Sequence, residues 1–243
     1  KKVASVPLAS EVLIGTVDKF DVRENGEFLI VDGKSQNVFL FDKEGKLKKR
    51  LSAEKCHPGI KWYPLNARFS ERGSILVILS HFPTAFWFNP DGECDRKYSD
   101  SIFQPFEYCI DSRHNVYGFF YHPDFYLGKY DSSGRAIFKF GTIPEEFKNY
   151  IRRFTGGSIA VDKNGYVYQV NISGPEIYKY GPDGTLVRII GRKPSYYISP
   201  ESDLPNTRSP QELMRKAAEI IRTASRTESI HLLQPDILMT QHY

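Results

Sequence analysis

"FDKEGKL" at residues 41–47 is one of four copies of a single seven-residue pattern. The others are FNPDGEC (88–94), YDSSGRA (130–136) and YGPDGTL (180–186). Each copy begins with Phe or Tyr, continues with mostly polar residues and has glycine at its fifth position. Glycine accepts positive φ at little steric cost, and Asp or Asn side chains bond to their own turn. Because apolar runs flank each copy, the pattern predicts a strand, a tight turn and a second strand.

A second kind of turn precedes each copy. It lies in VRENGEFLIV (22–31), FSERGSILVI (69–78), IDSRHNVYGF (110–119) and VDKNGYVYQV (161–170). The turn residue is glycine in the first, second and fourth stretches. In the third it is His114, and histidine enters the left-handed backbone region more often than most residues do. The two turns of a unit are 19 residues apart, or 20 in the unit with His114. The four units therefore share one plan.

The spacing of whole units predicts the fold class. Counted from Val22, Phe69 and Ile110 to the equivalent residue of the next unit, it is 47, 41 and 51 residues. Repeats of about 40–50 residues with four strands are typical of propeller blades. Helical repeats of this length would need apolar residues at every third or fourth position, which these segments lack. The aromatic content, 14%, also suits an all-β chain.

We therefore predict an all-β fold, a β-propeller of four-stranded antiparallel blades. The expected blades span about residues 17–62, 63–104, 105–154 and 155–204. In the first, strands a, b, c and d are expected near 17–22, 27–32, 37–42 and 46–51. Strand b reads FLIV in the first unit and ILVIL in the second. Such continuous apolar runs predict a strand that is buried on both faces.

Strand d of the first unit carries a basic run, Lys46, Lys48, Lys49 and Arg50. Lysine on an outer strand prevents unwanted pairing with other chains, so an edge position explains the run. Nucleic acid is not an expected partner, because the run does not recur in the other units and the net charge is only +4.

The C-terminal part departs from the repeat. The stretch SPQELMRKAAEIIRTASR predicts an inserted helix over about 209–226, since Ser209 and Glu212 form a capping box and Pro210 suits the first helical position. DILMTQHY then resembles strand b of the first unit, so 227–243 is expected to begin a fifth blade.

The sequence contains no run of eighteen apolar residues, so it predicts no membrane-spanning helix. The chain begins KKVASVPLAS, and we expect it to be a trimmed mature sequence.

Three cysteines are present, Cys56, Cys94 and Cys109. None belongs to a C-x-x-C pair, so the spacing predicts neither a zinc site nor a redox motif. Cys94 and Cys109 could meet across adjacent blades, but buried free thiols are the expectation.

Two stretches of the chain resemble a known repeat family. NGEFLIVDGKSQNVFLFDKEGKLKKRL (25–51) looks like an NHL-type repeat, and VDKNGYVYQVNISGPEIYKYGPDGTLVRIIG (161–191) is similar. That family builds six-bladed propellers, many of them bacterial and extracytoplasmic. The resemblance implies a six-bladed parent with about one and a half blades beyond this chain, and a periplasmic or cell-surface location. The family's usual Asn and Arg around the b–c loop survive only in part, as Asp32, Asn37 and Asn171.

In such a blade the a–b and c–d turns lie at one end, and the b–c loops and d–a connections lie at the other. The second end receives the long segments, which is where binding sites usually form. Aromatic and arginine side chains, which supply much of the energy of binding interfaces, gather there. We name the following set the loop-face residues: Trp62, Tyr63, His81, Phe82, His122, Phe125, Tyr126, Arg152, Arg153, Tyr196 and Tyr197. The alternative is that these rings cap a thin core.

The sequence predicts a propeller module or scaffold that binds a protein, peptide or carbohydrate. It assigns no catalytic residue and no cofactor, because G-x-S-x-G, H-E-x-x-H and phosphate-loop motifs do not occur. One alternative is a metal-dependent hydrolase or lyase. His81 and His122 lie in equivalent b–c loops of successive units, and Asp32 and Asn171 lie in the b–c loops of the other two, so these four side chains could converge near the axis and hold Ca²⁺ or Zn²⁺. Six-bladed lactonases and lyases hold their metal there, but this chain shares only the generic repeat with them. Asp32 could instead bond the amides of its own loop. Another alternative is a structural or sensor domain of a larger chain.

Overall fold

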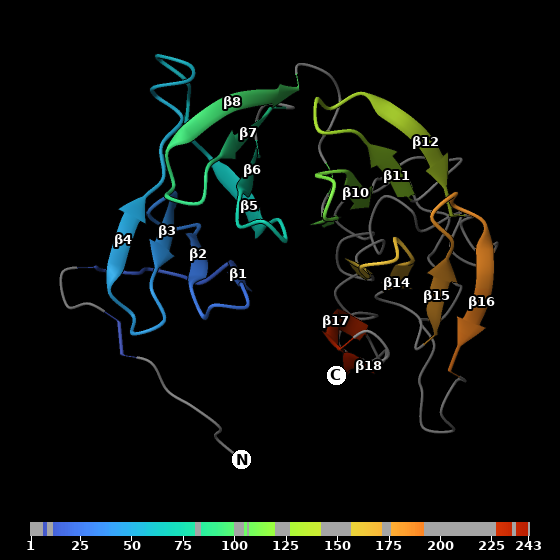
Figure 1. Cartoon of the computed structure of the whole chain (residues 1–243). Helices are drawn as coiled ribbons and strands as arrows, with labels where there is room; N and C mark the ends of the chain where they lie inside the picture. The colour runs from blue at the N-terminus through green and yellow to red at the C-terminus, as the bar shows by residue number, and fades with distance from the viewer. Residues whose placement is uncertain are drawn as a thin grey trace, which may run out of the picture. The chain divides into compact units, whose positions relative to one another are not determined.

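The structure is a computed structural model. It describes residues 7–8, 12–80, 84–99, 105, 107–119, 127–141, 157–171, 176–191, 227–234 and 237–242. Its regular secondary structure in these ranges is all β-strand (Figure 1). The predicted helix over 209–226 lies outside the described residues. Within the described ranges, no helix is long and apolar enough to cross a membrane.

Four antiparallel sheets follow the predicted plan, and each is one propeller blade. Blade 1 holds β1 (Lys19–Val22), β2 (Phe28–Asp32), β3 (Asn37–Phe41) and β4 (Leu47–Arg50). Blade 2 holds β5 (Pro64–Phe69), β6 (Ile75–Leu79), β7 (Ala85–Phe88) and β8 (Cys94–Ser99). Blade 3 holds β9 (Tyr108–Ile110), β10 (Val116–Phe119), β11 (Leu127–Tyr130) and β12 (Ala136–Phe140). Blade 4 holds β13 (Gly157–Val161), β14 (Val167–Asn171), β15 (Ile177–Tyr180) and β16 (Leu186–Ile190). Within each sheet the strands pair in sequence order.

The turns have the predicted backbone. Gly92, in the c–d turn of blade 2, has φ 77°, and its amide donates to the Asn89 carbonyl at 2.9 Å. A Cβ at Gly92 would lie 2.7 Å from Leu51 Cδ2, so the turn needs glycine for space as well as for conformation. His114, which replaces glycine in the a–b turn of blade 3, has φ 62°. The prediction that histidine takes the left-handed region is confirmed.

Residue contacts divide the chain into two compact units. The first comprises residues 1–104, 110–116 and 130–135. In it, β2 is buried on both faces because its side chains alternate. Leu29 and Val31 join a core shared by blades 1 and 2, whereas Phe28 and Ile30 pack on the other face of blade 1. The prediction for strand b is confirmed.

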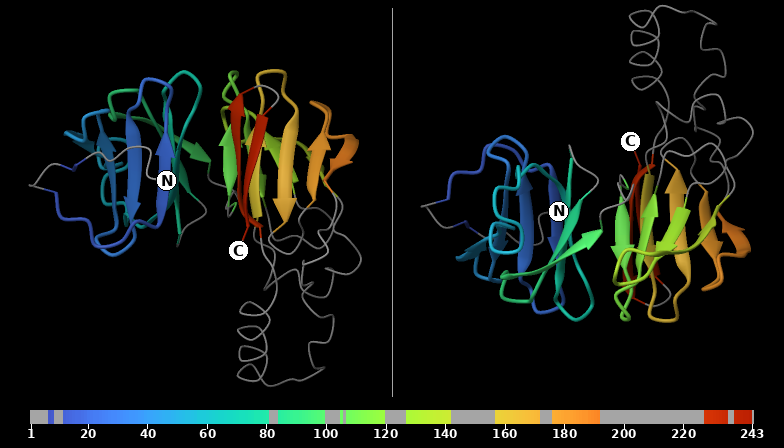
Figure 2. Two further views of the ribbon diagram at one scale, coloured as in Figure 1. Left: turned by 90° about the horizontal axis from the view of Figure 1, so that it is seen from below. Right: turned by 90° about the horizontal axis from the view of Figure 1, so that it is seen from above.

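The second unit comprises residues 105–109, 117–129 and 136–243. Its main core contains Tyr117 and Phe119 of blade 3 and Val167 and Tyr180 of blade 4. A two-stranded sheet, β17 (Thr227–Gln234) and β18 (Ile237–His242), lies in the region expected to begin a further blade. Figure 2 shows this pair in red beside blade 4, where β17 contacts β13 and β14.

Lys48, Lys49 and Arg50 of the basic run lie on β4, the outer strand of the blade 1 sheet, as predicted, and Lys46 precedes it. Lys48 pairs with Glu27, Lys49 pairs with Glu93, and the Arg50 guanidinium donates to Asn37. The outer strand of blade 4 differs. On β16, Leu186, Val187 and Ile189 are all about half exposed, so the rule of a polar outer strand does not extend to this blade.

The expectation of free thiols is wrong for two of the three cysteines. Cys56 and Cys94 form a disulfide, with Cα atoms 6.0 Å apart and a sequence separation of 38. The connection from β4 to β5 brings Cys56 to the start of β8, where Lys55 also pairs with Glu93. Cys109 is not part of a disulfide and is partly buried. The path of this connection, which no repeat pattern encodes, decides the pairing.

Candidate functional site

Most loop-face residues lie outside the described residues. These are His81, Phe82, His122, Phe125, Tyr126, Arg152, Arg153, Tyr196 and Tyr197. Trp62, Tyr63 and Asp32 are described, and Asn171 is described by its backbone as the last residue of β14. The structure therefore describes the loop end only at Asp32, at the connection from β4 to β5 and at the backbone of Asn171, and the remaining residues stay predictions.

Trp62 follows the disulfide-bonded connection and packs against the core of the first unit. Its ring centroid lies 6.0 Å from that of Phe88 in an edge-to-face arrangement and 6.4 Å from that of Phe86. Tyr63, also partly buried, accepts a hydrogen bond from the Ser80 amide at its carbonyl, at 2.8 Å. The packing of Trp62 is that of a ring capping the core, which is the alternative considered for the loop-face set.

Asp32 lies at the end of β2 and has no exposed surface. Its carboxylate accepts hydrogen bonds from the amides of Gly15 at 2.9 Å, Thr16 at 3.0 Å and Lys34 at 3.0 Å. The Ser35 hydroxyl also donates to it, at 2.6 Å. These bonds join the b–c loop of blade 1 to the segment that precedes β1. Asp32 therefore holds its own loop in shape, and its role as a metal ligand stays a prediction.

Asn37 completes this loop. Its Nδ2 donates to the Ser35 carbonyl at 2.9 Å and to Ser35 Oγ at 2.8 Å, and its Oδ1 accepts from Arg50. The Asp and Asn that carry the NHL resemblance in the first unit thus hold the b–c loop in shape. Among the described residues there is no group of three or more His, Cys, Asp or Glu side chains placed to hold a metal ion.

The hydrogen bonds to Asp32 make stability depend on pH. Burial alone would raise the pKa of Asp32, but the Ser35 hydroxyl and the Gly15 and Thr16 amides hold that pKa well below its ordinary value. A depressed folded-state pKa stabilises the fold above the unfolded value of about 4, and this contribution is lost as the pH falls below it.

We expect Asp32→Asn to lower the free energy of unfolding near neutral pH by about 1–3 kcal/mol. The Gly15 and Thr16 amides and the Ser35 hydroxyl all donate to the carboxylate, and the NH₂ group of asparagine cannot accept these hydrogen bonds. Urea titrations between about pH 5 and pH 2 should show a shallower loss of stability for the variant than for the parent. Asp95→Asn is the control, since Asp95 is half exposed and pairs with its neighbour Arg96. Equal pH slopes for parent and Asp32→Asn would contradict this role.

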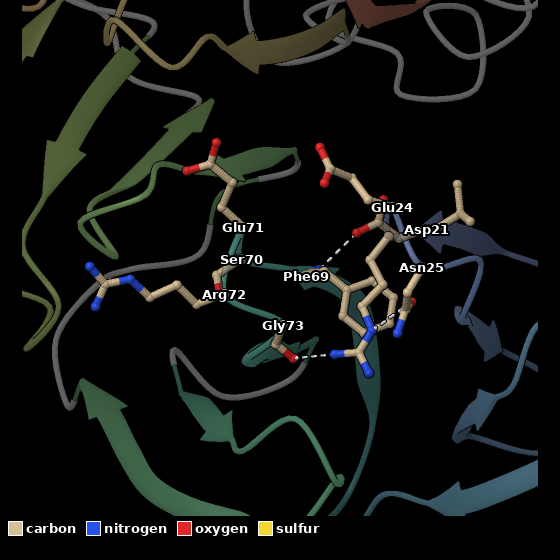
Figure 3. Close-up of a pocket in the computed structure, with 10 residues that line it drawn as sticks. Asp21, Glu24, Asn25, Phe69, Ser70, Glu71, Arg72 and Gly73 are labelled. Carbon is tan, nitrogen blue, oxygen red and sulfur yellow. Dashed lines mark hydrogen bonds between the residues drawn. The ribbon is translucent and has the colours of Figure 1, made fainter.

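A hollow of about 480 Å³ lies at the other end of the first unit, between the a–b turns of blades 1 and 2. The residues that line it are Asp21, Val22, Arg23, Glu24, Asn25, Phe69, Ser70, Glu71, Arg72 and Gly73 (Figure 3). Its volume is in the range of small-molecule sites. Sequence reasoning did not select this end, although the polar triplets of the a–b turns, REN and SER, were a visible signal.

Several polar groups of the hollow already connect the two blades. Asp21 Oδ2 accepts from the Phe69 amide at 2.7 Å, and burial raises the pKa of Asp21 against the opposing effect of Arg68. The Arg23 guanidinium donates to the Gly73 carbonyl at 3.3 Å and lies 5.2 Å from the Phe69 ring centre. Figure 3 shows both cross-blade hydrogen bonds as dashed lines.

The remaining charges of the hollow are Glu24, Glu71 and Arg72, which are exposed. They make no hydrogen bond or ion pair with the part of the chain that the structure describes. Exposed, unpaired charges on tight turns are ordinary for a solvated surface. The floor of this hollow thus holds blades together, and its rim is a charged surface.

Comparisons with known proteins agree on the fold. No family model matches the sequence, and no curated protein matches it. A member of the DUF4221 family from Bacteroides vulgatus superposes with a TM-score of 0.65 at 16% identity, covering 93% of this chain and 70% of that one. A Bacteroides fragilis protein described as exported has a TM-score of 0.57 at 16% identity, covering 76% of this chain and 52% of that one.

A catalytically inactive virginiamycin B lyase from Staphylococcus aureus, crystallised with quinupristin, has a TM-score of 0.51 at 16% identity. The match covers 88% of this chain and 59% of the lyase. The chain also matches 60% of the length of a Bacteroides caccae protein of unknown function. It therefore covers less than two thirds of several of the proteins that share its fold. Likeness at these identities shows the fold alone. The chain is a β-propeller, and six blades and the NHL class stay predictions.

Proposed function

We propose that this propeller is a binding module, and that it holds a protein, peptide or carbohydrate at its loop face. The observation that supports this proposal is that side chains at the opposite end, in the a–b turns, bond blades 1 and 2 to each other. There Asp21 and Arg23 bond across to blade 2, so this end of the first unit serves cohesion between blades. The loop end remains for recognition, and the sequence concentrates aromatic and arginine residues in its connections.

The module is proposed to act outside the cytoplasm. Disulfides persist in oxidising compartments and are rare in the cytosol, and Cys56 and Cys94 are joined in this chain. A neighbour in fold described as exported is consistent with the same location.

The binding proposal predicts a specific result. Phe125→Ala and Arg152→Ala should each weaken binding of a ligand identified from peptide and glycan arrays, because stacking and arginine contacts are lost. Their melting temperatures should stay within about 3 °C of the parent, since loop side chains add little to the blade core. Binding is measured by titration calorimetry. The matched control is Arg72→Ala at the turn end, which should bind as the parent does.

Two outcomes would replace this proposal. If Arg72→Ala weakens binding and the loop variants do not, the ligand sits in the turn-end hollow. If the chain cleaves quinupristin in the presence of Ca²⁺ or Zn²⁺, and His81→Ala or His122→Ala abolishes the cleavage, it is a metal-dependent lyase. That second candidate function is supported by the fold likeness to virginiamycin B lyase and by the predicted positions of the four candidate metal ligands in equivalent b–c loops.

A further inference from the structure

The a–b turns of successive blades touch through equivalent positions, but with different residue pairs. In blade 1, Arg23 donates to the carbonyl of Gly73, the turn glycine of blade 2, at 3.3 Å. Ser70 of blade 2 occupies the position of Arg23. Its Oγ lies 3.4 Å from Nε2 of His114, which occupies the turn-glycine position of blade 3. One contact thus joins a long side chain to glycine, and the next joins a short side chain to histidine.

Side-chain size explains this exchange. A Cβ at Gly73 would lie 2.2 Å from Arg23 Nη1, so a side chain there would displace the guanidinium from its present contact, and the φ of 82° also favours glycine. Ser70 is much shorter than arginine, and the His114 ring reaches it from the neighbouring turn. The left-handed conformation of His114, with φ 62°, directs the ring into this position at the cost of some backbone strain. The ring is partly buried.

The surroundings of His114 oppose its protonation. Its ring meets the Trp87 ring edge-on, with centroids 5.4 Å apart, and Trp87 is only 2% exposed. The charged groups that face it are Arg72 from the turn of blade 2, Arg96 from β8 and Asp111 from its own turn. Burial, followed by the two arginines, lowers the pKa of His114 below its ordinary 6.5, while Asp111 acts in the opposite direction.

We propose that His114 makes a proton-sensitive contact between the a–b turns of blades 2 and 3. Arg23 makes the equivalent contact between blades 1 and 2 with a group that stays charged at every ordinary pH. Of the two side chains, only His114 changes its own charge near neutral pH. Because the folded pKa is depressed, the unfolded chain takes up the proton first. The contact is intact above about pH 6.5, and its contribution is lost as the pH falls through that value towards the folded pKa.

Fluorescence of Trp87 tests this proposal. The chain has two tryptophans, so Trp62→Phe leaves Trp87 as the single reporter. A protonated imidazole quenches a neighbouring indole, and emission should therefore fall on acidification with a midpoint below about 6.5. His114→Gly on the same background should lack this step. Glycine is the appropriate replacement because it occupies the same turn position in the other three blades.

A double variant separates the proton effect from packing. Ser70→Arg with His114→Gly rebuilds the pair found between blades 1 and 2. It should melt at a higher temperature than His114→Gly alone, and its melting temperature should not follow the histidine titration. If Trp62→Phe fails to fold, the midpoint is measured in the parent chain from the His114 ring resonance in NMR spectra, assigned by its absence in His114→Asn. A fluorescence step that persists in His114→Gly, or a midpoint at or above about 6.5, overturns the proposal.

Discussion

Replacing Phe88 with Ala is expected to lower the free energy of unfolding by about 3–5 kcal/mol, the usual cost of removing a buried phenylalanine ring. Phe88 has no exposed surface and belongs to the core that blades 1 and 2 share. Its loss would also remove the edge-to-face partner of Trp62. Urea unfolding measures the change, and an unchanged slope with denaturant shows that the same amount of surface unfolds.

Phe20→Ala is the matched control for this substitution. Phe20 lies on β1 and is 52% exposed, so its truncation should cost less than about 1 kcal/mol. Equal costs for the two variants would mean that blades 1 and 2 do not share a packed core in solution.

Removal of the disulfide has the second-largest expected effect. Because it closes a loop across 38 residues, replacing Cys56 and Cys94 with Ser should lower the free energy of unfolding by about 2–4 kcal/mol. Most of this change comes from the greater conformational freedom of the unfolded chain, since the loop is no longer closed there.

Reduction provides an independent check. Dithiothreitol should lower the melting temperature of the parent and of Cys109→Ser, and it should leave the Cys56→Ser/Cys94→Ser variant unchanged. Thiol titration of the unfolded parent should find one free thiol before reduction and three after it. Three free thiols in the protein as isolated from an oxidising compartment would contradict the disulfide.

The sequence predicted features that depend on local chemistry. Gly92 lies at positive φ because a tight turn between two strands demands it, and the same argument covered His114. Strand b was recognisable because Leu29 and Ile30, on opposite faces of one strand, are both apolar. Each of these inferences needed only residues within one blade.

Features that depend on the path of a connection could not be predicted in this way. Cys56 meets Cys94 because the segment after β4 turns towards the start of β8, and no spacing in the repeat carries that information. Asp32 illustrates a second difficulty. A buried carboxylate at the end of a strand suits both a metal ligand and a group that holds its own loop, and the second role became visible only from its contacts with Gly15 and Thr16.

The order of these contacts along the chain has a consequence for biosynthesis. Asp21 and Phe69, Lys49 and Glu93, and the two bonded cysteines all lie within the first 94 residues. Proteins emerge from the ribosome or a translocation pore N-terminus first, at about 5–20 residues per second. The partners that join blades 1 and 2 are therefore available to one another several seconds before blade 4 is made. Blades 1 and 2 and their disulfide can therefore form early, as a nucleus for vectorial folding. Later blades would then fold against a blade pair that is already folded.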